Sequence, residues 1–420
     1  MSDYFVRIEQ QLVRRVEAGV PRTYGLRVPW GGLAAAAVVL VVVAIAGAFL
    51  LTLRSGPAQQ AGSRSSAGSS VTLSPPLATP LPTVDRVVSI LRERVAAVVP
   101  GVDVSREGAH IAIHAAHRTP VARPQILALA APGRLAFYDW EKNALLPSGE
   151  TVASQLNAPD PTAIQISQGG QGAPPGEPGA GSLSLYQAVV LAAEQPYEPS
   201  DDNSRLTPQY FLFGTPGSAA CTTAARDAGT VTTPRAHCLL SGPADTLQDL
   251  YAGLPTGVSA SQGQLLTIKR GTVVLQAANT SAKQIQLSSP KAQFYVLKDH
   301  VALSGKDITV PRPSTDQGGT SAVSFGFTSH GQSAFQKITS EIAHRGQLNS
   351  TLGPPHNQHF AVALDNQLIT VPQIDFRQYP DGIAATNGAD IVGNLTPQTA
   401  KTLSVILRFG PLPVAIKPIP

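Results

Sequence analysis

The most continuous hydrophobic pattern in the chain is an apolar run from Gly31 to Leu53, which contains no charged residue and one hydroxyl group, that of Thr52. A helix of this length covers roughly 34 Å, against about 30 Å for the hydrocarbon core of a bilayer. The run is longer than the apolar core of a cleaved signal peptide and begins far from the N-terminus. It therefore predicts a single membrane-spanning helix, since no other apolar run approaches eighteen residues.

The distribution of charge predicts the orientation of this helix. Residues 1–30 contain five arginines, whereas the thirty residues after the span contain two. Because basic segments remain in the cytoplasm, we expect a cytoplasmic N-terminus and an extracytoplasmic region over residues 54–420. In the cytoplasmic segment, Phe5, Ile8, Leu12 and Val16 have helical spacing. They predict an amphipathic helix on the inner membrane surface, with docking to a partner helix as the alternative.

The pattern beyond the span divides into a tether and a first folded region. Ser55–Pro82 is rich in Ser, Gly, Ala and Pro and predicts an extended tether. Thr83 is a plausible N-cap for the helix that follows. The order of elements predicts a small mixed sheet with helices on one face. The expected elements are a helix over 84–98, strands near 102–104 and 111–113, a helix from Pro124 to Ala131, and a strand over 135–140.

The middle of the chain has the weakest pattern and the end has the clearest. Residues 147–182 are rich in Gly and Pro and predict a flexible loop, and residues 196–262 show no clear fold. The last 150 residues predict a second α+β region with more strands than helices. Its expected elements are a helix capped by Ser329 and ended near Gly346, a hairpin turn at Asp365-Asn366, a helix opened by Thr396-Pro397 and ended by Gly410, and strands near 272–276, 293–297, 323–327, 360–364 and 368–371.

These patterns predict an α+β protein made of mixed sheets with helices on one face, behind one transmembrane helix. Its expected divisions are a cytoplasmic segment (1–30), the transmembrane helix (31–53), a flexible linker (54–83), a first extracytoplasmic part (84–146), a Gly/Pro-rich loop (147–182), an inserted region (183–265) and a C-terminal α+β module (266–418).

Charge and motifs exclude several function classes. Beyond residue 30 the chain carries 26 basic and 24 acidic residues, which gives no electrostatic reason to expect nucleic-acid binding. The sequence has no nucleophile-elbow, zincin or phosphate-loop motif, so we expect no enzyme and no cofactor. Asp365 is the one strong acid in its hairpin, and turn chemistry explains it without a catalytic role.

Cysteines and histidines were the candidates for covalent or metal chemistry. Cys221 and Cys238 both lie in the expected extracytoplasmic region, where an even cysteine count favours a disulfide over a metal pair with His237. His110 and His114, four residues apart on a strand, would be about 13 Å apart and cannot share a zinc ion. A second group, His344, His356 and His359, surrounds a polar loop without a nearby carboxylate in the sequence, so no metal site is expected.

Several stretches of the sequence resemble a known family in the same order along the chain. They resemble the first extracytoplasmic domain of SecD, the accessory subunit of the bacterial Sec protein-export machinery. The stretches are DRVVSILRERV (85–95), SGKDIT (304–309), SFGFTSHGQSAFQKIT (324–339), FAVALDNQLITVPQI (360–374) and IVGNLTPQTAKTLSVILRFGPLPVAI (391–416).

The resemblance implies a protein of the bacterial inner membrane whose outer domain binds emerging, unfolded preproteins. It implies the Sec translocon and a SecF-like subunit as partners. The chain departs from the family in two places: no Asp-Leu-x-Gly-Gly-type stretch lies between Leu53 and Val84, and the sequence stops at Pro420, where the second membrane helix of the family would begin. We therefore expect an export accessory without its own proton-conducting helices, and a single-pass structural or sensory ectodomain as the alternative.

The candidate residues for contact with an unfolded polypeptide are three aromatic residues. Phe325, Phe327 and Phe335 lie in the best-matched stretch, and their spacing is equally consistent with a position in the core.

Overall fold

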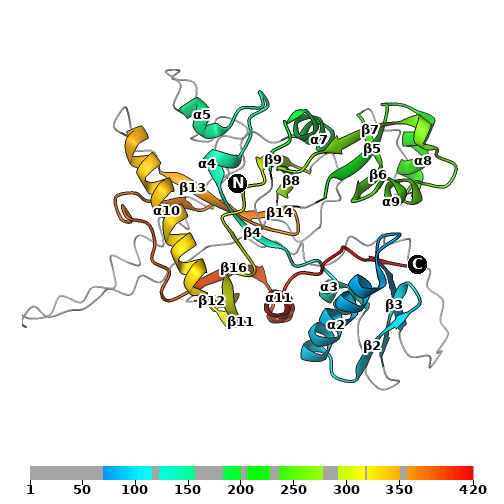
Figure 1. Ribbon diagram of the computed structural model, residues 1–420, viewed down its shortest axis with the longest axis horizontal. Helices are drawn as coiled ribbons and strands as arrows, with labels where there is room; N and C mark the ends of the chain where they lie inside the picture. Colours follow the sequence, from blue (N-terminus) through cyan, green and yellow to red (C-terminus); the bar gives the residue numbers. More distant parts are fainter. Residues whose placement is uncertain are drawn as a thin grey trace, which may run out of the picture. The chain divides into compact units, whose positions relative to one another are not determined.

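The computed structural model describes residues 70–115, 123–156, 183–199, 205, 207–227, 236–277, 292–316, 319–350 and 357–419 (Figure 1). The predicted cytoplasmic segment, the transmembrane helix over residues 31–53 and most of the tether lie outside these ranges. Within the ranges, no helix combines the length and the apolar character needed to cross a bilayer. Strands from distant parts of the sequence pair into four sheets, with helices packed on them, so the mixed α+β class is confirmed.

The first sheet, here called the terminal sheet, joins the two ends of the described chain. Its strand order is β17-β1-β3-β2, and every neighbouring pair is antiparallel. Apolar residues of helices α2 (Leu81–Val98) and α3 (Arg123–Leu129) share one buried cluster with the residues of this sheet. The strands are β1 (Ser70–Ser74), β2 (Val102–Glu107), β3 (His110–Ala115) and β17 (Lys417–Pro418).

Three details of this region differ from the sequence prediction. Residues 70–74 are not part of an extended tether, because Val71 and Leu73 alternate with polar residues and bury against the helices as strand β1. Helix α2 begins at Leu81, so Thr83 is not its N-cap. The strand expected at residues 135–140 leaves this region and pairs in the next sheet.

The largest sheet, here called the central sheet, has the strand order β10-β4-β13-β14-β8-β9, with β15 paired to β13. All of its pairs are antiparallel except β14 with β8. Short helices α4 (Trp140–Asn143) and α5 (Val152–Leu156) follow strand β4 in the sequence. The strands are β4 (Leu135–Asp139), β8 (Thr272–Ala277), β9 (Phe294–Lys298), β10 (Leu303–Ser304), β13 (Gln358–Leu364), β14 (Gln367–Thr370) and β15 (Gln373–Ile374).

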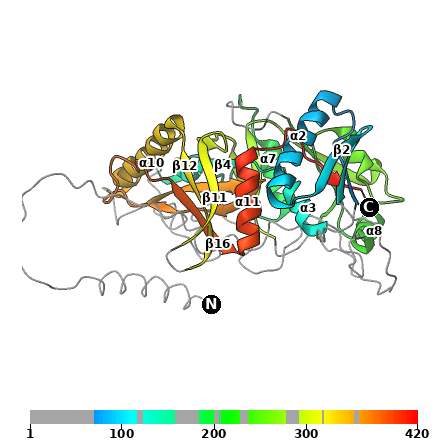
Figure 2. The same cartoon turned by 90° about the horizontal axis from the view of Figure 1, so that it is seen from below.

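The third sheet, here called the groove sheet, is antiparallel, with the order β11-β12-β16. Helix α10 (Ser329–Ser350) joins it to the central sheet through one continuous core, and helix α11 (Pro397–Phe409) runs beside strand β11 (Figure 2). Thr396 caps α11 and Gly410 ends it with φ 75°, as the sequence predicts. The strands are β11 (Ile308–Thr315), β12 (Ser321–Phe327) and β16 (Ala389–Leu395).

Helix α10 differs from its prediction at both ends. Its N-terminal cap is Thr328, whose Oγ1 accepts a hydrogen bond from the backbone N–H of Gly331, and not Ser329. The helix continues past Gly346 to Ser350 because tertiary contacts of Arg345 outweigh the weak helix propensity of glycine.

The fourth sheet, here called the disulfide sheet, occupies the region that had no clear fold in the sequence. Its order is β6-β5-β7, with helices α8 (Ala219–Asp227) and α9 (Leu247–Ala252) packed on it. Helix α7 (Leu185–Glu194), which is capped by Ser184, packs between this sheet and the central sheet. The strands are β5 (Gln209–Gly214), β6 (Cys238–Ala244) and β7 (Gly263–Ile268), and a 3-10 turn spans Ala260–Gln262.

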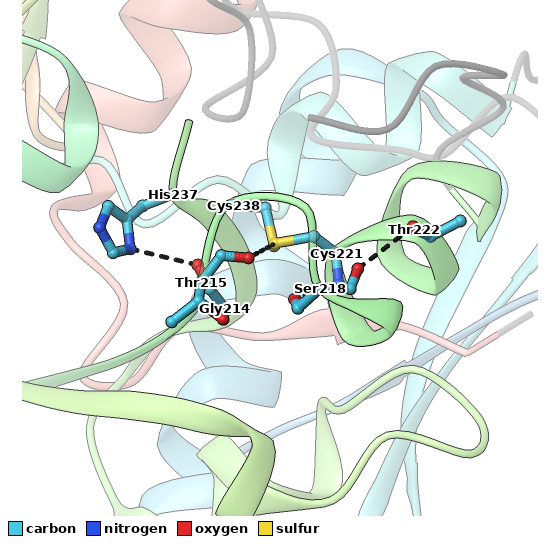
Figure 3. Close-up of a disulfide and its surroundings, with 7 residues drawn as sticks. All are labelled: Gly214, Thr215, Ser218, Cys221, Thr222, His237 and Cys238. Atoms are coloured by element: carbon cyan, nitrogen blue, oxygen red, sulfur yellow. Dashed lines mark hydrogen bonds between the residues drawn. A yellow bond between two sulfur atoms is a disulfide. The ribbon is translucent and has the colours of Figure 1, made fainter. Parts of the chain in front are cut away.

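The two cysteines form the predicted disulfide between α8 and β6 (Figure 3). Their Cα atoms are 5.7 Å apart, and Cys221 is fully buried. Gly214 lies beneath the bond, where a Cβ atom would be 2.8 Å from the Cys221 sulfur. His237 does not share a site with the sulfurs: its Nδ1 is 3.2 Å from the Gly214 carbonyl oxygen, and its ring stacks on Tyr186 at a centroid distance of 3.8 Å.

A buried arginine connects three separate parts of the chain. Arg94 of α2 is fully buried and its guanidinium donates to four carbonyl oxygens. The acceptors are Leu129 at 2.9 Å, Ala131 at 2.6 Å, Pro132 at 3.2 Å and Gly410 at 2.5 Å. Burial lowers the pKa of Arg94 to about 10, and the nearby Asp365 opposes that shift, so the side chain stays charged at neutral pH.

Replacing Arg94 should weaken the fold strongly. Arg94→Leu leaves buried carbonyl groups without donors, and we expect the free energy of unfolding to fall by about 3 kcal/mol or more. Arg94→Lys keeps the charge but offers a single point donor, so an intermediate loss is expected. Urea denaturation followed by circular dichroism measures both. The exposed Arg86→Leu on the same helix is the control, and an equal loss there would contradict the role assigned to Arg94.

The disulfide should stabilise the sheet to which it belongs. Its cysteines are 17 residues apart, and the chain-entropy model gives about 3 kcal/mol for a loop of that size. Replacing both cysteines by alanine should lower the melting temperature of the protein. Mass spectrometry of non-reduced peptides should find Cys221 joined to Cys238, and two alkylatable thiols in protein isolated without reductant would rule the bond out.

Candidate polypeptide-binding groove

The aromatic residues expected from the sequence to contact polypeptide lie in the core. Phe325 and Phe327 of β12 are 5% and 6% exposed, and Phe335 of α10 is 1% exposed. The ring of Phe335 lies 5.1 Å from that of Phe327 and 5.6 Å from that of Phe360, measured between centroids. These rings connect the groove sheet to the central sheet through α10, so their side chains are not available to a ligand on the surface.

An open groove lies nearby, between strand β11 and the C-terminal end of α11. Its volume is about 500 Å³, which is within the range of small-ligand sites. Both walls belong to the part of the chain where the sequence resemblance is clearest. The lining residues are Gly305, Lys306, Ile308, Val310, Pro311, Arg312, Leu407, Arg408, Phe409, Gly410 and Pro411.

A bulge in β11 shapes the first wall. The pairing of β11 with β12 shifts register between Thr309 and Arg312, and Val310 has a φ of 44° within this shift. Positive φ is strongly disfavoured for a β-branched residue. The bulge turns Val310 outward, where the residue is 74% exposed, and turns Pro311 inward. The wall therefore presents an apolar side chain to solvent at the free edge of the groove sheet.

The second wall is the last turn of α11. Leu407 is buried, Phe409 is half-buried and the guanidinium carbon of Arg408 lies 5.7 Å from the centroid of the Phe409 ring. The wall ends at Gly410, whose carbonyl oxygen accepts from Arg94. The same arginine that joins α2 to the rest of the fold thus holds this end of the groove.

A hydrogen-bonded turn supports the end of the groove at Lys306. Asp307 is nearly buried, and its Oδ2 accepts from the Ser304 N–H at 2.7 Å. Its Oδ1 is 2.8 Å from Nδ1 of His330, and its carbonyl oxygen accepts from the Thr328 N–H at 2.9 Å. These contacts bind the turn to the start of α10 and leave the Lys306 side chain exposed.

The described histidines that were singled out in the sequence lie on three elements, β3, α10 and β13. His110 and His114 are exposed on β3, and the Nε2 of His114 is 3.1 Å from Oε1 of Glu107. His344 is exposed on α10, and His356 lies outside the described residues. His359 does have a carboxylate partner, contrary to expectation: its Nδ1 is 2.6 Å from Oε1 of Glu141, which is distant in sequence.

That contact belongs to a buried polar network between β4, α4, α10 and β13. Arg345 donates to both carboxylate oxygens of Asp139, at 2.9 Å and 2.5 Å, and also to Gln358. Burial raises the pKa of Asp139, while the Arg345 guanidinium opposes that shift. Because Arg345, Asp139 and Glu141 each have a partner within the network, we interpret the network as structural. The sequence carried no signal for it, since its members come from four separate elements.

The groove lies in the part of the chain that is similar to known proteins. Residues 279–414 match the family of the SecDF P1 head subdomain, and this range contains every residue that lines the groove. SecD of Rickettsia felis is 30% identical over 129 residues, which are 31% of this chain and 21% of the relative. SecD of a Synechocystis species is 36% identical over 123 residues, covering 29% of this chain and 23% of the relative.

Solved SecDF structures give weak overall similarity. A crystal structure of SecDF in a super-membrane-facing form has a TM-score of 0.38 and 17% identity, covering 84% of this chain and 30% of that one. A structure described as a membrane component SecDF that enhances protein export has a TM-score of 0.36 and 16% identity, covering 84% of this chain and 98% of that one.

The matched region places the chain among proteins that carry a domain of the protein-translocase accessory class. Over residues 279–414 it is similar to the SecD family, and the subdomain matched there is the SecDF P1 head. The matched region spans about a fifth of the length of the SecD relatives.

Asp365 is the acidic residue for which the sequence analysis considered a catalytic role. In the structure it has a structural role in a turn, and its pKa is raised. It forms the expected turn with Asn366, at φ values of 52° and 65°. Its Oδ1 accepts from the Arg134 backbone N–H at 2.8 Å, which turns the carboxylate inward. Burial raises the pKa of Asp365, opposed by backbone N–H groups and by Arg94. The fold therefore prefers the neutral carboxyl group to the charged one.

Asp365→Asn should stabilise the protein at neutral pH. The stabilising effect of a raised pKa is fully present below the unfolded pKa and is lost as the pH rises through the folded pKa. Asparagine stays neutral, keeps an acceptor oxygen and tolerates positive φ. We expect equal melting temperatures for variant and wild type near pH 3, and a higher value for the variant at about pH 7. A variant that is less stable by the same margin at both pH values would contradict the charge argument.

Proposed function

We propose that this protein is an accessory component of Sec-dependent protein export that binds unfolded preproteins on the outer side of the cell membrane. One observation carries the proposal most directly: the P1 head subdomain holds an open groove with an exposed apolar residue on a sheet edge. The relatives of this subdomain are protein translocase subunits, which supports a role in translocation.

The groove suits weak binding of many different chains. An exporter must hold and release segments of unrelated sequence, which favours apolar contacts over a fixed set of polar pairs. Strand β11 is the edge strand of the groove sheet in the part of the chain that the structure describes, but Pro311 and Pro313 lack N–H donors and limit its pairing with an added strand. Side-chain contacts with Val310 and Phe409 are therefore proposed to dominate over β-augmentation.

Membrane attachment and energy coupling complete the proposal. The apolar run Gly31–Leu53 is proposed to hold the domain at the bacterial inner membrane with the N-terminus in the cytoplasm. That run contains no ionisable side chain, and conversion of a proton gradient into movement requires such groups within the membrane. Coupling is therefore assigned to the Sec translocon and a SecF-like subunit, with this chain as a tethered holder of the emerging polypeptide.

Site-directed photo-crosslinking tests the groove. A photoreactive amino acid at Val310 of the full-length protein should crosslink to an unfolded client, because this residue is 74% exposed and lines the groove. The same amino acid at Leu348 is the matched control, since Leu348 is 67% exposed on α10 and does not line the groove. We expect several-fold more crosslinked client from position 310, measured by gel shift and mass spectrometry.

Equal yields at the two positions would remove the groove from the proposal. If, in addition, the solubilised protein failed to co-purify with the Sec channel, a structural or sensory role of the ectodomain would replace the export role.

A further inference from the structure

We propose that the groove between β11 and α11 selects unfolded segments in which an apolar residue lies next to acidic residues. This inference rests on the proposed function, and it adds the chemical class of polypeptide that the groove prefers.

The lining of the groove has one sign of charge. Lys306, Arg312 and Arg408 line it and are exposed, and no aspartate or glutamate is among its lining residues. In the described part of the chain, none of the three forms an ion pair with a carboxylate. Their positive charges are therefore available to a ligand.

The acidic group nearest in sequence does not neutralise them. Asp307 follows Lys306 directly, but its carboxylate oxygens contact the Ser304 N–H and the His330 ring, and Asp307 is not among the lining residues. The carbonyl groups at the end of α11 supply only a partial negative charge, about half an elementary charge. Arg94 already binds the one at Gly410. Three full positive charges outweigh what remains.

The apolar and cationic parts of the groove lie close enough to act on one segment. Val310 and Arg312 are two residues apart on β11, and Arg408 and Phe409 are adjacent on α11. An apolar ligand side chain packs against Val310 and Phe409, while a carboxylate beside it pairs with Arg312 or Arg408. Basic segments meet repulsion at the same place. Exposed ion pairs are individually weak, so the discrimination expected from three of them is roughly tenfold.

Binding of matched peptides to the full-length protein tests this selection. Three fluorescent, unstructured peptides share one apolar pattern and differ only in flanking residues, which are Asp, Ser or Lys. Fluorescence anisotropy at low salt should give the tightest binding for the Asp peptide, roughly tenfold tighter than for the Ser peptide, and the weakest for the Lys peptide. Added salt should reduce these differences, because the charges are exposed.

Two charge-matched variants locate the effect. The triple variant Lys306→Gln, Arg312→Gln, Arg408→Gln should bind all three peptides with the affinity that wild type has for the Ser peptide. The control variant Arg226→Gln, Lys337→Gln, Lys401→Gln removes the same number of charges from exposed helix positions outside the groove and should keep the preference for Asp.

Each result has a distinct meaning. Equal binding of the three peptides to wild type overturns the selection and leaves polypeptide binding in place. If wild type binds none of the three peptides, both the selection and the proposed function are overturned. A preference for Asp that persists in the groove variant overturns the assignment to Lys306, Arg312 and Arg408.

Discussion

The hydrogen bonds of Arg94 are the interaction on which the arrangement of the described chain depends. The connection from α3 to β4 and the chain that leaves α11 both pass this residue, and the Leu412 N–H donates to the Pro132 carbonyl oxygen between them at 2.8 Å. A guanidinium has enough donors to satisfy several carbonyls from one side. Gly133 has a φ of 81°, and a Cβ atom there would lie 2.9 Å from the Arg94 guanidinium. The groove wall at Gly410 is therefore held from α2, more than 300 residues earlier in the sequence.

Local chemistry explains which elements could be predicted from the sequence. Helix α11, with Thr396 and Gly410 at its ends, and the Asp365-Asn366 hairpin follow from neighbouring residues alone. The disulfide sheet did not, because β5 is apolar without alternation and β6 contains Pro243, which argues against a strand. The groove could not be predicted from the sequence either, because Lys306, Arg312 and Arg408 come together only when β11 and α11 lie side by side. The aromatic residues that the sequence favoured as polypeptide contacts belong to the core.

The part of the chain that resembles SecD does not include the disulfide sheet. The matched residues 279–414 contain the groove sheet, α10, α11 and part of the central sheet, whereas the disulfide sheet lies before them. Apolar residues on α7 pack against strands of both the central and the disulfide sheets, so the two share a buried boundary. The disulfide sheet contributes no residue to the lining of the groove.

The pairing of β1 with β17 determines how the described chain bears mechanical load. The two strands are antiparallel, with Leu73 opposite Pro418, and the Ile419 N–H donates to the carbonyl oxygen of Thr72. Residues 70 and 419 thus leave the terminal sheet at the same end. Tension pulling both ends away from the sheet opens this pair like a zipper, one hydrogen bond at a time, and does not load all of its bonds in shear. Such tension would release the two-residue strand β17 well before it disturbed the sheet formed by β1, β3 and β2.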